Sequence, residues 1–200
     1  MKRLLFLICA PLVPMVLHSQ EFFEPEDGIV ASTYTDEYEL AVQNTMREYL
    51  DPYACYKLVA IPSIGTEWAV DVAINDTKAW VTGVKVGTRI FSIYQKKDPN
   101  YKVSKIFRNI DLGLATKIES LSQTIISEVR YSTTENFGMD GVTFHFSSWT
   151  KDQGFRFGKT WSPDEGSRAS IVTDLGRLLL KYAFTEIDSS QIQEFVSKSA

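Results

Sequence analysis

Cysteine and histidine are scarce in this chain, which has two of each among 200 residues. A structural zinc site takes about four ligands from these two residue types. Beyond residue 20 only Cys55 and His145 remain, so that part of the chain holds neither such a zinc site nor an internal disulfide. We therefore expect no metal and no other cofactor.

An excess of positive charge is also lacking, since the formal net charge is −4. Loss of Lys2 and Arg3 with residues 1–19 would leave 19 basic against 25 acidic residues, a net charge of −6. Proteins that bind nucleic acid present a basic face to the phosphates. Nucleic acid is therefore excluded as the main partner.

The short motifs of common enzymes are absent as well. The chain has no Gly-x-Ser-x-Gly elbow, phosphate-binding glycine loop, His-Glu-x-x-His or Cys-x-x-Cys. Catalysis would then depend on groups that only the fold brings together.

The first residues have the pattern of a secretory signal peptide. A basic start precedes an apolar stretch, Leu4–Leu17, that Pro11 and Pro14 interrupt. A membrane span needs about 20 apolar residues, and this stretch is shorter. We therefore predict a signal peptide of residues 1–19 that is cleaved near Ser19, with a membrane anchor as the alternative. With a single cysteine left after cleavage, we expect a bacterial protein that is periplasmic or secreted.

Hydrophobic spacing predicts the elements of the remaining chain. Residues 20–35 form an extended leader that rests on the domain through Phe22 and Phe23. The expected helices span 36–50, 111–130 and 189–198, with another that starts at a Ser162 cap. The expected strands span 54–61, 66–75, 78–86, 88–95, 141–149 and 154–161. Residues 101–107 form either another strand or the approach to the following helix.

This order predicts an α+β fold in one domain, residues 36–200. Its antiparallel sheet combines a meander with a C-terminal hairpin, and the helices pack on one face.

His145 is the weak catalytic candidate, as a general base oriented by Asp140 or Asp152. It lies in the middle of a strand between Phe144 and Phe146, where an ordinary structural role is commoner because active-site groups concentrate on loops.

Two other candidates fail on spacing or surroundings. Glu67 and Asp71 would lie about 13 Å apart along one strand, too far for the pair of carboxylates that cleaves glycosides. Cys55 has only Lys57 nearby to activate it, so a buried, inert thiol is expected.

The hairpin supplies the binding candidates Trp149, Arg156 and Trp161. Tryptophan and arginine dominate protein-binding hot spots, although two tryptophans that cover the core would explain the same pattern. Scarce catalytic groups and an acidic surface favour an exported, non-enzymatic binding protein, such as an inhibitor or immunity-type partner of another protein. A small envelope hydrolase that uses His145 and a component of an envelope assembly are the alternatives, and the oligomeric state stays open.

Overall fold

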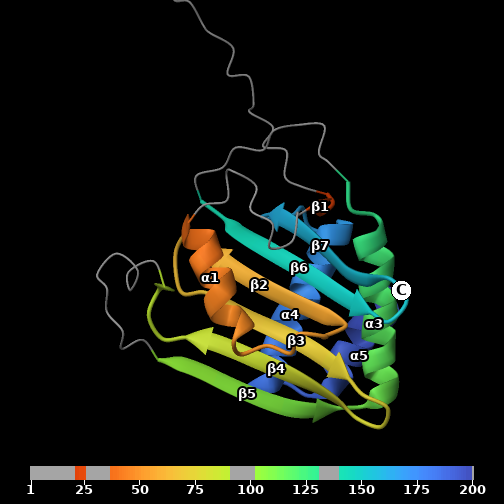
Figure 1. Cartoon of the computed structure of the whole chain (residues 1–200). Helices are drawn as coiled ribbons and strands as arrows, with labels where there is room; N and C mark the ends of the chain where they lie inside the picture. The colour runs from red at the N-terminus through yellow and green to blue at the C-terminus, as the bar shows by residue number, and fades with distance from the viewer. Residues whose placement is uncertain (1–20, 26–36, 91–101, 131–139, 200) are drawn as a thin grey trace, which may run out of the picture.

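One antiparallel sheet organises the protein (Figure 1). The computed structural model describes residues 21–25, 37–90, 102–130 and 140–199. In this part the seven strands follow the order β1-β7-β6-β2-β3-β4-β5. The predicted signal peptide, most of the leader and most of the predicted strand 88–95 lie outside the described residues.

The strands are β1 (Glu24–Pro25), β2 (Tyr56–Pro62), β3 (Trp68–Ile74), β4 (Ala79–Val86), β5 (Val103–Ile110), β6 (Val142–Thr150) and β7 (Gly154–Trp161). The helices are α1 (Glu37–Arg47), α3 (Leu112–Ser127), α4 (Arg168–Ala183) and α5 (Ser189–Ser199). The predicted α+β class, with a meander and a C-terminal hairpin in an antiparallel sheet, is confirmed.

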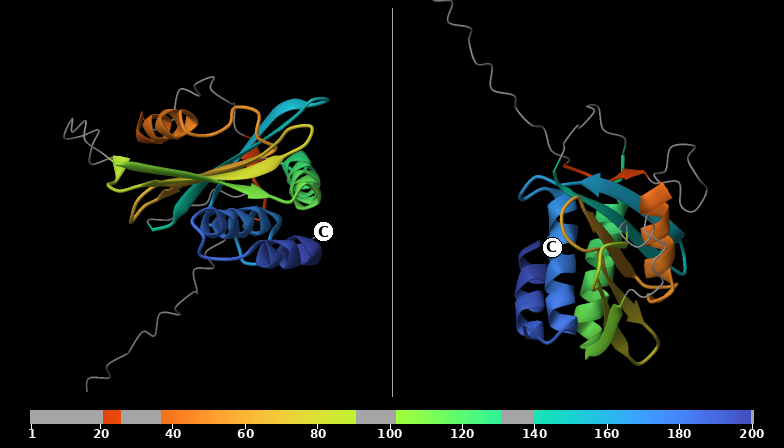
Figure 2. Two further views of the ribbon diagram at one scale, coloured as in Figure 1. Left: turned by 90° about the horizontal axis from the view of Figure 1, so that it is seen from below. Right: turned by 90° about the vertical axis from the view of Figure 1, so that its left-hand side faces the viewer.

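The helices lie on both faces of the sheet, as the two views in Figure 2 show. Helices α3, α4 and α5 cover the larger core, in which Leu58, Val70 and Phe144 are buried. Helix α1 packs on the opposite face, which we call the α1 face, against Val59 and Val84. The expectation that all helices share one face is therefore wrong for α1. Alternate residues of β2, β3 and β4 are apolar on both faces, so each face needs a cover.

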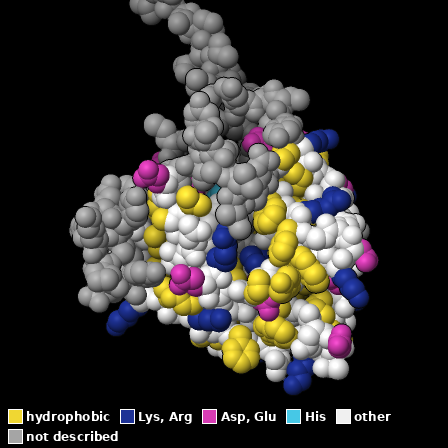
Figure 3. All heavy atoms as spheres, viewed as in Figure 1, with side chains coloured by type: hydrophobic (Ala, Val, Ile, Leu, Met, Phe, Trp, Pro, Cys, Tyr) yellow, Lys and Arg dark blue, Asp and Glu magenta, His cyan; other side chains and the backbone are white. Residues whose placement is uncertain are grey.

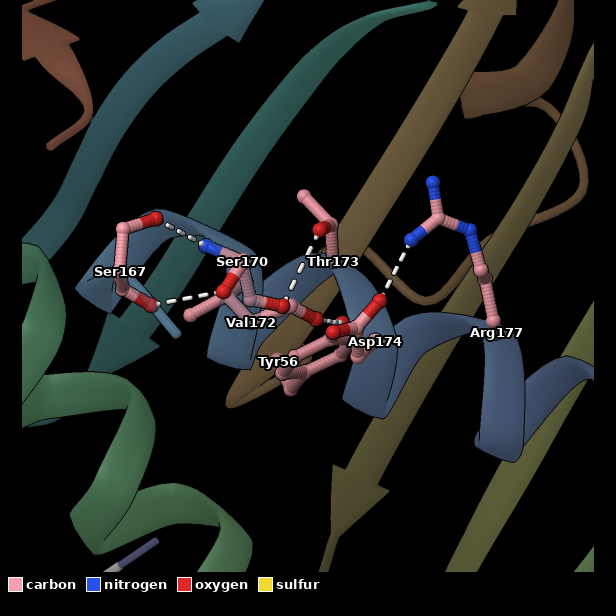
Figure 4. A network of polar contacts seen from close by, with 7 residues as sticks. All are labelled: Tyr56, Ser167, Ser170, Val172, Thr173, Asp174 and Arg177. Carbon is pink, nitrogen blue, oxygen red and sulfur yellow. Dashed lines mark hydrogen bonds and ion pairs between the residues drawn. The ribbon is translucent and has the colours of Figure 1, made fainter. Parts of the chain in front are cut away.

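Helix α4 begins later than its sequence predicts. Its N-cap is Ser167, whose side chain accepts a hydrogen bond from the amide of Ser170 (Figure 4). The predicted cap, Ser162, instead has a left-handed backbone with a φ of 39°. Its Oγ accepts from the amide of Val142 at 3.0 Å, so this residue closes the end of the hairpin.

The leader takes part in the fold through residues 21–25. Phe23 is buried in the larger core, and β1 pairs with β7 through Glu24 and Lys159. The backbone carbonyl of Phe23 also accepts from the amide of Arg130. These residues therefore form the edge of the sheet rather than an exposed tail.

Candidate functional site

A pocket of about 270 Å³ opens on the α1 face, between the end of α1 and strands β2, β6 and β7. Its apolar walls consist of Leu50, Pro52, Val59, Phe155 and Phe157. Figure 3 looks at this face and shows hydrophobic side chains gathered beside Lys and Arg side chains. A mostly apolar hollow with a few polar groups is the usual form of a small-molecule site.

Aromatic rings continue from the pocket toward the turn of the hairpin. The rings of Phe155 and Phe157 stack with centroids 5.9 Å apart, and Tyr53 stacks on Phe155 at 6.1 Å. Trp149 meets Tyr53 edge-on at 5.2 Å. Tyr53 is 60% exposed and Phe155 is 46% exposed. We call these four side chains the aromatic row, and it presents an apolar approach to the pocket.

Two cationic side chains, Arg47 and Lys57, also line the pocket. Arg47 is exposed, whereas Lys57 is half-buried and donates to the backbone carbonyl of Pro52 at 3.4 Å. In the described part of the chain neither cation has an acidic partner within 4 Å. Burial lowers the pKa of Lys57. The pocket therefore combines apolar walls with positive charge.

Lys57 and Ser147 begin a row that crosses three strands. The register sets Lys57 opposite Ser147 and Ser147 opposite Phe157. All three side chains line the pocket, so an ammonium and a hydroxyl stand directly beside an aromatic ring.

His145 lines the pocket and is only 6% exposed. Gln43 Nε2 lies 3.1 Å from His145 Nδ1, and because an amide nitrogen donates, Nδ1 accepts and Nε2 carries the ring hydrogen. His145 Nε2 lies 3.8 Å from Glu39 Oε2, and the same carboxylate oxygen is 2.7 Å from Lys159 Nζ. The carboxylate beside the imidazole is therefore Glu39, and neither Asp140 nor Asp152 takes that place.

This arrangement is poorly suited to general-base catalysis. A general base needs a lone pair directed at substrate, and on His145 that lone pair already accepts from Gln43. Ser147 lies two residues further along the strand, about 7 Å away at the usual rise, and is out of reach of the ring. The imidazole instead ties α1 to β6.

A second polar cluster holds the start of α1 on the sheet. Tyr38 donates to Glu67 Oε1, and Arg89 Nε donates to Tyr38 Oη at 3.3 Å. Glu67 is completely buried, and its other oxygen accepts from the amide of Ile90 at 3.0 Å. Burial and the bond to Glu67 raise the pKa of Tyr38 to about 12, so the phenol keeps its proton at neutral pH. Helix α1, which forms one wall of the pocket, is thus held on the sheet at two points, by Tyr38 on Glu67 and by Gln43 on His145.

The structure does not gather the predicted binding residues Trp149, Arg156 and Trp161 in one patch. Trp149 pairs with Phe155 beside the hairpin turn, whereas Trp161 pairs with Thr143 at the other end. Arg156 alternates with Phe155 and Phe157, so its side chain points to the opposite face. Of the three, only Trp149 belongs to the aromatic row.

Sequence reasoning missed Arg47, Lys57 and Phe157 as site residues. Alternation along the hairpin does put Phe155 and Phe157 on the face of His145, and this signal could have found them. Nothing in the sequence places Arg47 of α1 above these strands.

A second hollow lies beside the start of α4, and Figure 4 shows the polar contacts of Ser170, Asp174 and Arg177 there. Several of its polar groups bond within the chain: Ser170 Oγ donates to the Ser167 carbonyl, and Asp174 pairs with Arg177 at 2.6 Å. Tyr56 likewise donates to the Val172 carbonyl at 2.6 Å. These contacts account for the cluster as packing between β2 and α4.

Within the described ranges, no group of three or more His, Cys, Asp or Glu side chains could hold a metal ion. No helix among the described residues has the length and apolar character needed to cross a membrane. Comparison of the chain with family models, curated proteins and solved structures finds no match.

Proposed function

We propose that this chain is an exported, non-enzymatic binding protein that takes its ligand into the pocket under α1. The observation that carries the proposal is the pocket itself, an apolar hollow of about 270 Å³ with a few polar groups from both α1 and the sheet. This volume lies just below the usual range of small-molecule sites, roughly 300–1,000 Å³.

The pocket is formed before any ligand arrives. Two hydrogen bonds join α1 to this side of the fold, one between Tyr38 and Glu67 and one between Gln43 and His145. Lys159 adds an ion pair to Glu39 at 2.7 Å. A wall held by buried polar contacts loses little conformational entropy when a ligand binds. These contacts support a binding role for the pocket.

The test uses N-phenyl-1-naphthylamine, a neutral apolar dye whose fluorescence rises in apolar surroundings. We expect saturable binding at one site per chain. Ser147→Phe should abolish this binding, because the new ring fills the space between Lys57 and Phe157. Ser120→Phe is the matched control, since Ser120 is exposed on α3, and it should bind the dye like the parent chain.

Circular dichroism and thermal unfolding would establish that both variants are folded. Dye binding that is absent in the parent chain, or unchanged in a folded Ser147→Phe, would overturn the proposal.

A hydrolase is the second candidate, and one observation favours it: His145 lines the pocket with Glu39 3.8 Å away. The bond from Gln43 to Nδ1 opposes it. A p-nitrophenyl ester of short chain length tests this candidate. Turnover that exceeds the rate in free imidazole and is lost in His145→Gln would replace binding by catalysis as the function.

A protein partner is the other occupant that the aromatic row would suit, as an inhibitor target or a neighbour in an envelope assembly. Such a partner would insert an apolar side chain into the pocket. Tyr53→Ala and Phe155→Ala would then weaken its capture, while Arg156→Ala, on the opposite face, would leave the capture unchanged.

A further inference from the structure

We infer that the ligand of this pocket is a medium-chain amphiphile with one anionic head group, of which a free carboxylate is the simplest form. The inference rests on the proposed function and adds the chemical class of the ligand. Its basis is the position of Lys57 and Arg47 relative to the apolar walls.

The head group would lie at Lys57. This side chain is half-buried, and among the described residues its ammonium donates only to the neutral carbonyl of Pro52. Asp71 stands opposite Lys57 in the register, but no carboxylate of the described residues lies within 4 Å of the ammonium. Asp71 and Asp51 act on the ammonium from beyond 4 Å, so an anion that enters the pocket gains a charge-assisted bond at closer range.

Two neighbours complete the head-group site. The Ser147 hydroxyl faces Lys57 across β2 and β6 and is able to donate a hydrogen bond to a carboxylate. Arg47 stands at the exposed rim, on the same wall as Gln43 one helical turn before it. An anion at this point is therefore met from both the sheet and the helix.

The tail would lie along the aromatic side of the pocket. Phe157 follows Ser147 in the same row across the strands, and Phe155 and Val59 extend the apolar wall. A head group on Lys57 thus leaves the first methylenes against Phe157. A volume of about 270 Å³ limits the length of the tail, which favours medium chains over long ones.

The experiment measures displacement of N-phenyl-1-naphthylamine from the whole folded chain, below the critical micelle concentration of each competitor. Decanoate should displace the dye at least tenfold better than decan-1-ol, and decyltrimethylammonium should be the weakest. Between hexanoate and decanoate, affinity should rise about fourfold for each methylene.

Lys57→Met keeps the apolar stem and removes the charge, so it should bring decanoate and decan-1-ol within threefold of each other. Arg47→Met should have a smaller effect in the same direction. Lys181→Met is the matched control, because Lys181 is exposed on α4, and it should keep the full preference for decanoate.

The outcomes separate the two proposals. If the dye binds but decanoate and decan-1-ol displace it equally, the pocket is a ligand site and the inferred ligand class is wrong. If the dye does not bind at all, the proposed function fails and the inference fails with it. If the chain co-sediments with phosphatidylglycerol vesicles while soluble decanoate does not displace the dye, the site recognises a lipid surface. That outcome also overturns the inference of a free amphiphile.

Discussion

Lys57 and Asp71 lie directly opposite each other on β2 and β3, and their side chains share the α1 face of the sheet. Asp71 is completely buried, and its Oδ2 accepts from the backbone amide of Asp51 at 2.5 Å. Burial raises the pKa of Asp71 to about 6, although that amide, Thr82 and Lys57 act in the other direction. Burial also lowers the pKa of Lys57. The sheet thus disfavours the charged form of both groups.

This relationship makes stability depend on pH through Asp71. Its pKa is 3.8 when unperturbed and about 6 in the fold, so between these values the folded state binds more protons than the unfolded state. The contribution of this group to the free energy of unfolding therefore falls as pH rises from about 4 to about 6. A shift of this size corresponds to about 3 kcal/mol at neutral pH.

We expect Asp71→Asn to be more stable than the parent chain at pH 8, by ~1–3 kcal/mol. The amide keeps an acceptor for the Asp51 N–H and carries no charge. Urea unfolding measured from pH 4 to pH 8 would show the difference shrink as pH falls. A difference that does not change with pH would mean that Asp71 titrates normally in the fold. Asp76→Asn, at an exposed position in the turn between β3 and β4, is the control. Its stability should not differ from that of the parent chain at any pH in this range.

Tyr38→Phe should loosen α1 from the sheet. The substitution removes the hydroxyl that donates to the buried Glu67 and accepts from Arg89, and a buried acceptor that loses a partner costs ~1–3 kcal/mol. Hydrogen exchange should speed up in α1 while α4 keeps its protection. Tyr53→Phe, at a 60% exposed side chain, should stay within ~0.5 kcal/mol of the parent chain. Equal exchange in α1 of both variants would show that the Glu67 cluster does not hold this helix.

Cys55 should resist thiol reagents in the folded chain. Its side chain is 3% exposed, its Sγ donates to the Val72 carbonyl at 3.3 Å, and burial raises the pKa of the thiol well above its usual range. Native protein that carries Cys9→Ser, so that Cys55 is its single thiol, should therefore leave 5,5′-dithiobis(2-nitrobenzoic acid) unreacted at pH 8 for hours. The same protein unfolded in urea should react at once. Rapid labelling without denaturant would show that the start of β2 opens frequently.

Gly176→Ala should destabilise the packing of α4 on β2. A Cβ at this position would meet the side chain of Leu58 and lie 2.6 Å from Tyr56 Oη, which already donates to the Val172 carbonyl. Overpacking of this kind costs ~1–3 kcal/mol and outweighs the gain of ~1 kcal/mol in helix propensity. Lys181→Ala, at an exposed position of the same helix, is the comparison and should change stability by less than ~0.5 kcal/mol. Gly176→Ala that raises the unfolding temperature would contradict the close approach.

Local sequence patterns predicted most of the fold. The alternation of Trp68, Val70 and Val72 marks β3, and the helical stripe from Leu114 to Val129 marks α3 within a few residues of its bounds. The start of α4 was misplaced because Ser162-Pro163 has the composition of a cap, while Ser162 bonds to Val142 across the hairpin. That contact joins residues 20 positions apart and has no local signal.

The site was less predictable than the fold. Alternation alone placed His145 and Ser147 on one face, but their partners Gln43 and Lys57 come from a helix and a strand far away in the chain. Trp149 and Trp161 looked like neighbours because each ends an arm of the hairpin. Antiparallel pairing separates them by six residue positions along the strands, about 20 Å at the usual rise.

The pairing of β1 with β7 brings Glu24 against Lys159. The edge of the sheet therefore joins one strand that the ribosome synthesises early with another that it synthesises late. Synthesis proceeds from the N-terminus, and Phe23 has no place in the core until the hairpin of β6 and β7 exists. Contacts of such long sequence separation form slowly, because a large loop must close first. Until then the growing chain carries an exposed phenylalanine and an unpaired strand, and both attract other chains.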